Sequence, residues 1–401
     1  MNILMLLNAP YPDDIRVSKE AKSLAEAGHT VFILCTKKSP KEASVEKLPF
    51  ATVIRCNPGN SLYMQAFWDV VMSVRFIHPI FYRAAKKAIK EYSIAAVHVH
   101  DLPLAGTGIK LAKKFGLRSI VDLHENYPEA IKVWFQWKKN PIARLKNYLF
   151  LNYQRWIAWE AKACREADVI IAVVEEMKER LVNMHPLSSD KIKIISNTEN
   201  KDFLNQPVFS DIYGNTEGRF IVAYTGNVGP HRGVDTLVEA FQYLKDFPKI
   251  ELHISGSTTQ TVKEKLLDIV HLHGLEQQVF LKGHQPFSHF YSLMKMADVN
   301  VIPHHRNGHT DNTIPHKLFQ AMMTGKPLLV SSSPPLARTV TEYHSGLVFE
   351  ASNAKSLAEA IQQLYNSPEL AASLGSNGLK ATQEKGANWE TSALDLVKIY
   401  A

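Results

Sequence analysis

The stretch TDNTIPHKLFQAMMTGKPLLVSSSPP, residues 310–335, contains the pattern that decides the fold. Apolar side chains recur there at helical spacing, and the apolar run that follows Gly325 predicts a buried strand. We expect Asn312 or Thr313 to cap this helix and Pro315 to lie in its first turn. The stretch therefore predicts a helix that leads directly into a strand.

The same alternation of apolar runs and amphipathic helical segments continues along the chain. One series lies within residues 1–203 and a second within residues 204–385, with the polar residues 205–218 as the expected linker. Such alternation predicts an α/β protein with two doubly wound parallel sheets, in which ligands bind outside the carboxyl ends of the strands. Strands are expected over residues 2–7, 30–35, 95–100, 119–124, 168–173, 191–196, 220–226, 250–256, 279–284, 298–303 and 327–332.

Composition agrees with two ordinary globular domains. The chain has 401 residues and a net charge of +7, which favours anionic partners without choosing among them. Three scattered cysteines, Cys35, Cys56 and Cys164, predict a reduced cytosolic protein. The first residues do not read as a signal peptide, and no apolar run approaches the roughly 18 to 20 residues of a membrane span. We therefore expect a cytoplasmic protein that can still lie on a membrane.

Four strand ends carry residues suited to chemistry. The glycine-containing turn at residues 226–232 ends in Arg232, and Lys317 lies at the start of the helix described above. Free amide groups at helix starts favour an anion, so both places predict phosphate binding, although a plain turn and a solvated helix end are the structural alternatives. His124 with Glu125, and His100 with Asp101, follow two strands of the first series, where a histidine is more often structural than catalytic.

The sequence contains no recognisable pattern for a metal site or for the usual nucleotide-binding loops. The stretch IPHHRNGHTDNTIPH contains His304, His305, His309 and His316, but their spacing fits no usual zinc pattern and Arg306 would repel a cation. We therefore expect no metal site. Neither a Walker sequence nor a dinucleotide glycine fingerprint is present.

Four segments together resemble a known family. These are DDIRVSKEAKSLAEAGHTV, VDLHENYPE, GNVGPHRGVDTLVEAF and NTIPHKLFQAMMTGKPLLVS. They look like the retaining glycosyltransferases of family 4, and they occur in the expected order over nearly the whole chain. The resemblance implies a GT-B fold, in which two Rossmann-like domains face each other across a cleft and the final helix, residues 386–401, crosses back to the first domain. It also implies an NDP-sugar donor, UDP- or GDP-linked, in the second domain, an acceptor in the first, and no required metal or other cofactor.

The resemblance also implies roles for individual residues. Arg232 and Lys317 would hold the donor diphosphate, and His124 would contact the donor sugar near its reacting carbon. Gly283 and His284 would flank the nucleobase. The catalytic residues would be His124, Arg232 and Lys317, and the donor-binding residues Gly226, Asn227, Gly229, Arg232, Gly283, His284, Asn312, Thr313, Ile314, Pro315, His316, Lys317, Leu318 and Gln320.

The chain departs from the family pattern in three places. Asn227 stands where the family often has arginine, and Asn312 and Gln320 replace two glutamates. In relatives the second glutamate bonds the ribose hydroxyls, which Gln320 can still do with a weaker neutral hydrogen bond. Asp311 could supply a carboxylate instead. These amides leave the nucleobase open and are the best support for a non-catalytic sugar-nucleotide-binding subunit, one alternative beside a GT-B epimerase.

Two basic and aromatic segments suggest a surface for the acceptor. Residues 131–159 contain no acid, and residues 67–90 have a similar composition. Basic residues mixed with Trp and Tyr suit an anionic membrane interface, although core packing or a protein partner would explain them too. No nucleic-acid-binding module is recognisable. We expect a peripheral enzyme at the inner face of the plasma membrane, acting on a lipid-linked or growing glycan acceptor in envelope polysaccharide or glycolipid synthesis.

Overall fold

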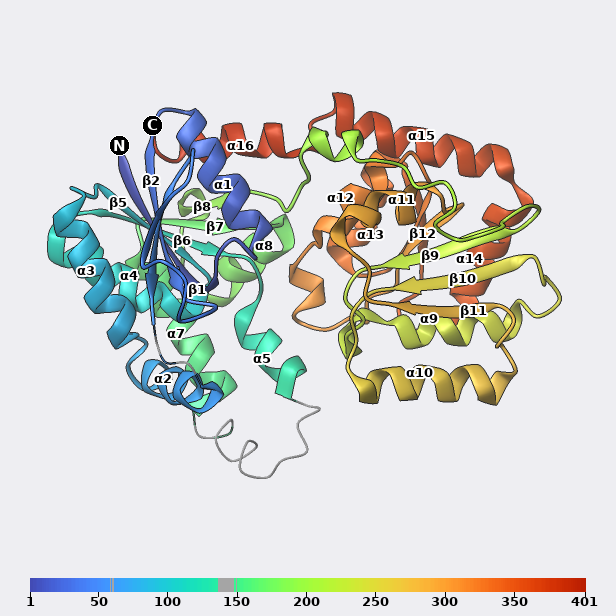
Figure 1. Ribbon diagram of the computed structural model, residues 1–401, viewed down its shortest axis with the longest axis horizontal. Coiled ribbons are helices and arrows are strands. Elements are labelled where there is room, and N and C mark those ends of the chain that lie inside the picture. The colour runs from blue at the N-terminus through green and yellow to red at the C-terminus, as the bar shows by residue number, and fades with distance from the viewer. Residues whose placement is uncertain (58, 60, 136–147, 149) are drawn as a thin grey trace. The chain divides into compact units, whose positions relative to one another are not determined.

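The computed structural model describes residues 1–401 except 58, 60, 136–147 and 149, and it contains two compact units (Figure 1). Unit 1 consists of Met1–Ser196 and Ala393–Ala401, and unit 2 of Asn197–Ser392. The division therefore falls at residue 196 rather than 203, and at 392 rather than 385. Hydrogen bonding explains the first shift, because the Asn197 side chain donates to the carbonyl of Ile314 within unit 2.

Unit 1 is built on an eight-stranded sheet with the order β3-β4-β2-β1-β5-β6-β7-β8. All neighbouring strands are parallel except β3 and β4. The strands are β1 (Asn2–Pro10), β2 (Thr30–Thr36), β3 (Val45–Lys47), β4 (Thr52–Cys56), β5 (Ala96–His100), β6 (Arg118–Leu123), β7 (Val169–Ala172) and β8 (Ile192–Ile194). The helices are α1 (Ile15–Glu26), α2 (Leu62–Arg75), α3 (Pro79–Glu91), α4 (Leu102–Phe115), α5 (Tyr127–Phe135), α7 (Tyr153–Glu166), α8 (Glu175–Met184) and, from Ala393 onward, α16 (Trp389–Lys398).

Helix α1 shows how the sequence forms the layers of unit 1. The Asp14 side chain accepts a hydrogen bond from the amide of Val17 and so caps the helix. Val17, Ala21 and Leu24 recur at helical spacing and are fully buried. Gly28, with a φ of +86°, adopts the left-handed conformation that lets the chain turn into β2. These residues therefore set both ends of α1 and the face that it buries.

Unit 2 contains a six-stranded parallel sheet with the order β11-β10-β9-β12-β13-β14. Helices cover both faces of this sheet (Figure 1). The strands are β9 (Phe220–Thr225), β10 (Ile250–Ser255), β11 (Val279–Gly283), β12 (Val299–Ile302), β13 (Leu328–Ser331) and β14 (Gly346–Phe349). The helices are α9 (Val234–Ala240), α10 (Gln260–His273), α11 (Phe290–Lys295), α12 (His316–Met323), α13 (Pro334–Tyr343), α14 (Ala354–Asn366) and α15 (Pro368–Glu384).

The expected linker, residues 205–218, is instead an integral part of unit 2. Tyr213 within it is 9% exposed, and its hydroxyl donates a hydrogen bond to the carbonyl of Leu293. The ring joins a small apolar cluster that includes Ile221 and Ala223 of β9. The prediction of a linker was wrong because polar composition concealed one well-anchored aromatic side chain.

The start of α12 also differs from expectation. The helix begins at His316 with Pro315 at the cap position, and no side chain caps it. Asn312 and Thr313 donate backward instead, to the carbonyls of Gly308 and His309. Their short polar side chains stabilise the preceding loop turn, which competes with helix capping for the same groups.

Candidate active site

Glycines bring the backbone of two loops together at the carboxyl end of the unit 2 sheet. Gly226 follows β9 with a φ of +129°, and a Cβ on Gly256 would lie only 1.7 Å from the Gly226 carbonyl oxygen. A Cβ on Gly226 would lie 3.5 Å from Cδ of Lys317. The stem of Lys317 therefore lies close to the turn after β9, which joins two of the sequence-predicted segments.

Lys317 occupies an environment that disfavours its charge. Its Nζ lies 3.9 Å from the ring centroid of Tyr224, which is a favourable cation–π geometry. Burial, followed by the nearby charge of Arg232, lowers the pKa of Lys317 well below its ordinary value. Among the described residues, neither Lys317 nor Arg232 has a carboxylate partner. An anion bound here would stabilise both charges.

Arg232 lies two residues before α9 and donates a hydrogen bond to a histidine. Its Nη1 donates to Nε2 of His304 at 3.1 Å. Because a guanidinium can only donate, His304 accepts at Nε2 and is a neutral imidazole. Burial and Arg232 also lower the pKa of His304 well below its ordinary value, and they lower that of His231 to about 3. The site thus brings together the guanidinium of Arg232 and the amine of Lys317, with neutral histidines around them, and a bound anion would favour the charged form of the lysine.

The other predicted residues of this loop have structural contacts. Ile314 and Leu318 are buried in unit 2, and the Ile314 carbonyl accepts the bond from Asn197. Pro315 and His316 are half-buried at the helix start. The histidine-rich loop is held by ordinary partners too, since His305 Nε2 lies 2.8 Å from Asp235 Oδ1.

Gln320 is buried and is already engaged. Its Nε2 donates to Oε2 of Glu199 at 2.7 Å, and both side chains are no more than 5% exposed. Sequence reasoning missed Glu199, because nothing in its local pattern marks it. Asp311, the expected substitute carboxylate, forms an ion pair of 3.0 Å with Arg306 instead. Glu199 is therefore the carboxylate that stands beside Gln320.

Gly283, one of the two predicted nucleobase residues, lines a small cavity at the ends of β10 and β11. Its volume is about 190 Å³. Gly283 lines it with a φ of +69°, and His284 Nδ1 lies 3.0 Å from the hydroxyl of Ser257. Asn227 is exposed. A Cβ on Gly229 would lie 3.3 Å from Oδ1 of Asn227.

In unit 1, His124 directly follows β6 and lies close to two carboxylates. Its Nε2 lies 3.0 Å from Oδ2 of Asp122 and 3.2 Å from Nδ1 of His100. Its backbone amide donates to Oδ1 of Asp101, whose other oxygen lies 3.5 Å from Nδ1 of the ring. The two histidine candidates and Asp101 are thus in one cluster, and Asp122 is a member that the sequence did not single out.

The pKa values of His124 and His100 are shifted in opposite directions. Burial opposes the charge of His124, but Asp101 and Asp122 outweigh burial and raise its pKa to about 10. Burial and His98 lower the pKa of His100 to about 3. At neutral pH His124 is therefore an imidazolium and His100 is neutral. His124 is the only one of the two that offers positive charge.

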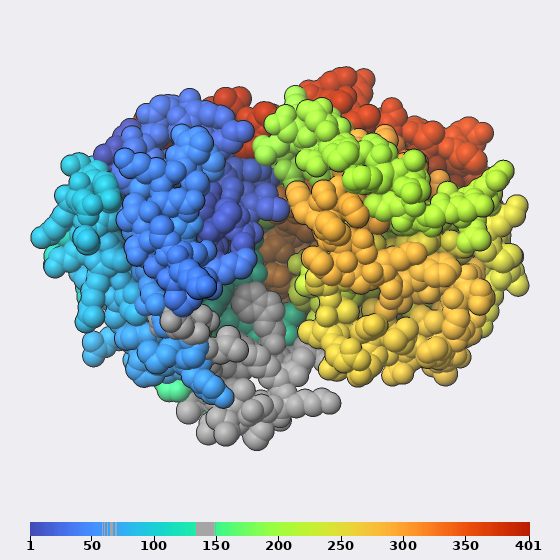
Figure 2. Space-filling view, viewed as in Figure 1, coloured from blue at the N-terminus to red at the C-terminus, as the bar shows by residue number. Residues whose placement is uncertain are grey.

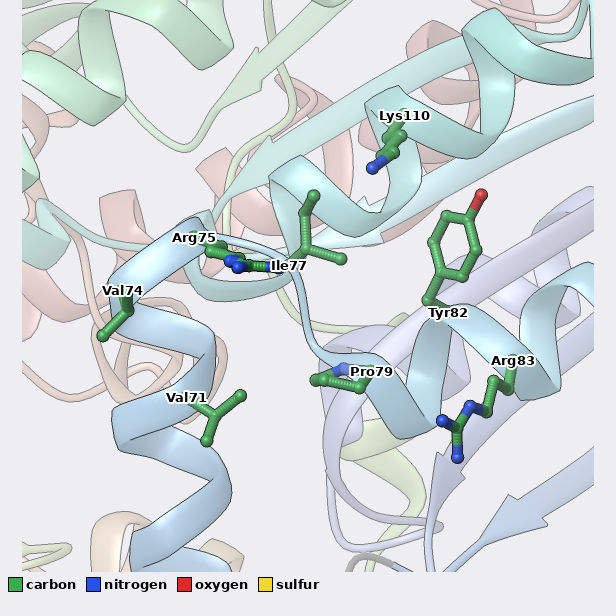
Figure 3. Close-up of a pocket in the computed structure, with 8 residues that line it drawn as sticks. All are labelled: Val71, Val74, Arg75, Ile77, Pro79, Tyr82, Arg83 and Lys110. Carbon is green, nitrogen blue, oxygen red and sulfur yellow. The ribbon is translucent and has the colours of Figure 1, made fainter.

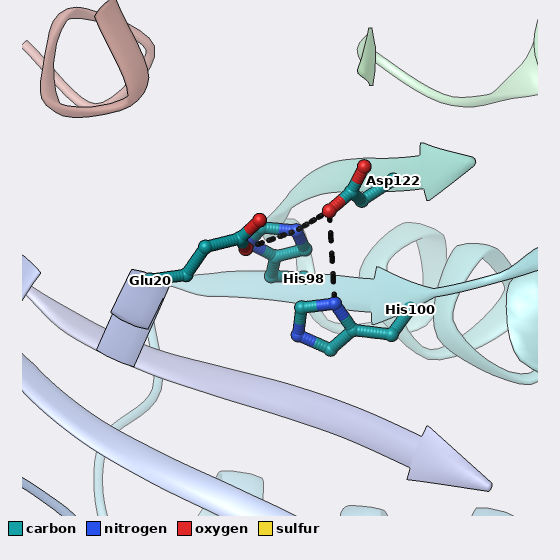
Figure 4. A group of neighbouring side chains, drawn as sticks. All are labelled: Glu20, His98, His100 and Asp122. Atoms are coloured by element: carbon teal, nitrogen blue, oxygen red, sulfur yellow. Dashed lines mark ion pairs between the residues drawn. The ribbon is translucent and has the colours of Figure 1, made fainter. Parts of the chain in front are cut away.

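A cluster of buried side chains that contacts His124 has the spacing of metal ligands. It contains Glu20, His98, His100 and Asp122 (Figure 4). Arg16 already supplies the positive charge there, because its Nε lies 2.9 Å from Glu20 and 3.0 Å from Asp122. A second cation would be repelled by this guanidinium, so the group is better described as an ion-paired cluster that holds Asp122 against His124.

The C-terminal segment contributes to the same cluster. Tyr400 is 2% exposed, and its hydroxyl lies 2.6 Å from Nδ1 of His98. Tyr400 belongs to the segment Ala393–Ala401 of unit 1. The cluster is therefore assembled from both ends of the chain.

Comparison with protein families divides the chain in the same way. Residues 16–200 match the family model described as Glycosyltransferase Family 4, and residues 205–381 match Glycosyl transferases group 1. The two matches together include His124, Arg232 and Lys317.

Individual relatives and solved structures agree with these family matches. An uncharacterized glycosyltransferase of Methanocaldococcus jannaschii is 26% identical over 80% of this chain and 78% of its own length. The putative glycosyltransferase EpsD of Bacillus subtilis is 25% identical over 75% and 74%, and the capsular polysaccharide biosynthesis glycosyltransferase CapM of Staphylococcus aureus 23% over 55% and 59%. Sucrose-phosphate synthase from Thermosynechococcus elongatus superimposes with a TM-score of 0.79, 20% identity and coverage of 100% and 98%. Anabaena HepE in complex with UDP gives 0.72 at 13% identity, with coverage of 100% and 99%. The fold is therefore GT-B.

Proposed function

The chain belongs to the family 4 glycosyltransferases, and from that premise we propose that it transfers a sugar from an NDP-sugar, with retention of configuration, to a lipid-linked or growing glycan acceptor. The observation that carries the proposal is the pair of cations, Arg232 and Lys317, which lack carboxylate partners among the described residues. Two fixed cations beside a glycine turn match the charge of a nucleoside diphosphate.

The chemistry places the main demand on the leaving group. The bond between the anomeric carbon and the diphosphate oxygen breaks, while the acceptor hydroxyl oxygen bonds to that carbon on the same face. The acceptor proton passes to the departing diphosphate, which gains negative charge as its bond breaks. Arg232 and Lys317 would stabilise that charge, and we propose that no metal ion is needed for this reason.

His124 is proposed to act on the transferred sugar as a fixed cation. With a pKa of about 10 it holds its protons at neutral pH, so it does not serve as a general base. Its Nε2 is bonded to Asp122, whereas its Nδ1 lies 3.5 Å from Asp101, too far for a strong hydrogen bond. The Nδ1–H group is therefore the one available to a substrate oxygen.

Relatives and neighbours support the choice of donor and pathway. Solved structures of HepE contain UDP and UDP-glucose, which supports a uridine donor for the present enzyme. CapM is named for capsular polysaccharide biosynthesis, which supports an envelope glycan product.

We also propose that the enzyme works in the cytoplasm at the inner face of the membrane. No helix among the described residues is long and apolar enough to cross a bilayer. Of the two basic and aromatic segments, 131–159 includes residues 136–147 and 149, which lie outside the described residues, so segment 67–90 carries this part of the proposal.

Release of free nucleotide tests the transfer reaction. Purified enzyme would be given UDP-, GDP- and other NDP-sugars with and without a membrane lipid extract, and NDP would be measured. Transfer predicts release only when an acceptor is present, and the product linkage should keep the anomeric configuration of the donor. An NDP-sugar epimer formed without acceptor would indicate an epimerase, and tight binding without turnover a non-catalytic subunit.

A further inference from the structure

A cavity in unit 1 shares no residue with the cluster around His124. It has a volume of about 390 Å³ and lies where α2, α3 and α4 meet (Figure 3). One part of its wall is apolar, formed by Val71, Val74, Ile77 and Pro79. The remaining lining includes three cationic side chains. Such a wall suits a ligand with both an apolar and an anionic part.

The three cations come from separate elements and have no counter-charge. Arg75 ends α2, Arg83 lies on α3 and Lys110 on α4, and no carboxylate lines the cavity. Within the described part of the chain, none of the three forms an ion pair or a hydrogen bond. Lys113, one turn further along α4, differs in this respect because it pairs with Glu166 at 2.9 Å. Like charges gathered without a carboxylate favour an anion.

Helix α2 presents an unusual apolar surface next to this cavity. Tyr63 is 89% exposed, Phe67 54% and Val74 51%, and their spacing places them on one side of the helix. The space-filling view shows α2 at the surface of unit 1 (Figure 2, light blue). Apolar side chains exposed on one side of a helix mark a surface that contacts a partner or a membrane. A partner that contacts this side of α2 would be apolar, whereas a ligand in the adjoining cavity would be negatively charged.

We propose that this cavity binds the phosphate headgroup of an anionic membrane lipid, while the exposed side of α2 lies among the upper acyl chains. Arg75, Arg83 and Lys110 would contact the phosphate, and Val71 and Val74 the first methylene groups. A bilayer leaflet is the occupant that supplies both chemistries in this order. The inference rests on the proposed membrane association and names the site that produces it.

Vesicle binding of two matched variants tests the site. Arg83→Gln and Lys87→Gln remove the same charge one turn apart on α3, and only Arg83 lines the cavity. With vesicles of phosphatidylglycerol and phosphatidylcholine, Arg83→Gln should weaken binding at least about fivefold, the usual effect of one cation at an anionic surface. Lys87→Gln should stay within about twofold of wild type. Equal losses in the two variants would replace the headgroup site by a diffuse electrostatic attraction.

A soluble ligand separates a lipid from a free phosphate. Short-chain phosphatidylglycerol, below its micelle concentration, should raise the Tm of the wild type but not that of an Arg75→Gln/Arg83→Gln/Lys110→Gln variant. The same rise with glycerol 3-phosphate would show a phosphate site and overturn the lipid assignment. Circular dichroism would establish that the triple variant is folded.

The activity of the same proteins keeps this inference apart from the proposed function. NDP release with a soluble acceptor should be unchanged in the triple variant. Wild-type enzyme that turns over but ignores anionic vesicles would refute the lipid site and leave transfer intact. Selective vesicle binding through Arg83 in a protein without turnover would support the site while refuting the proposed reaction.

Discussion

Replacement of Lys317 by methionine isolates the effect of its charge. Methionine keeps an unbranched stem near Gly226 and the contact with the Tyr224 ring, so the fold should be preserved. One preorganised charged donor at a developing anion is typically worth about 2.7 to 4 kcal/mol. At about 1.4 kcal/mol per factor of ten, Lys317→Met should lower kcat by roughly 100- to 1000-fold. Lys326→Met, in the loop after α12, is the matched loss of charge outside the site.

The environment of Lys317 predicts a second, independent signal. Burial and Arg232 lower the pKa of Lys317, and a bound diphosphate would raise it again by opposite charge. Binding of UDP should therefore draw a proton from solution wherever the free lysine is partly neutral. Calorimetric titrations in buffers of different ionisation enthalpy would measure this uptake. It should disappear in Lys317→Met, and the Tm of that variant should rise because folding no longer buries an ammonium group.

Arg232→Ala should show a rate loss of the same order, and the double variant should lose less than the product of the two. The reason is that both cations act on one leaving group, and such effects are not additive. Unchanged kcat in both single variants, together with unchanged proton uptake, would mean that the anion site in unit 2 has been assigned wrongly.

Three further outcomes follow from the two polar clusters. His124→Ala should lower kcat by about 100-fold with NDP affinity near wild type. It should also lower Tm, because the carboxylates that raise the pKa of the imidazolium stabilise its charged form in the folded state. A folded variant with lower Tm but wild-type turnover would mark the ring as structural. Asp122→Asn should move the alkaline fall of kcat to lower pH, since the imidazolium is lost as pH rises through its pKa, which Asp101 would still raise but Asp122 would not. Gln320→Glu should lower the unfolding free energy by about 1 to 3 kcal/mol in denaturant melts, because a second buried carboxylate would face Glu199; an unchanged or higher value would contradict the Gln320–Glu199 contact.

Much of the fold was accessible from the sequence because strands buried on both faces are continuously apolar. The strands around Leu4 and Val222 illustrate this, since each is shielded by helices and carries no polar interruption. The short strand β3 was missed because all three of its residues are exposed. Strand β4 was missed because Thr52 and Arg55 interrupt its apolar residues, and β14 because its apolar run is only four residues long. Edge strands lack the burial that makes central strands visible.

The candidate site was only partly accessible for a different reason. Gly226, Arg232 and Lys317 could be selected because glycine turns and helix starts have local signatures. Asp122 and Glu199 could not, since their roles depend on partners far away in the chain, Arg16 for Asp122 and Gln320 for Glu199. Local pattern identifies residues that bind by backbone geometry, whereas buried polar networks become visible only after the chain has folded.

The divided composition of unit 1 has a consequence for the order in which the protein is made. The segment Ala393–Ala401 belongs to unit 1 and brings Tyr400 to His98, yet a ribosome reaches it only after the whole of unit 2. Domains usually fold as they emerge, the N-terminal one first. Here the unit begun first is the last to be completed. Until then, Nδ1 of His98 lacks its contact with the Tyr400 hydroxyl, and the surface that Tyr400 covers is exposed to water. Unit 2, by contrast, can fold from a continuous segment.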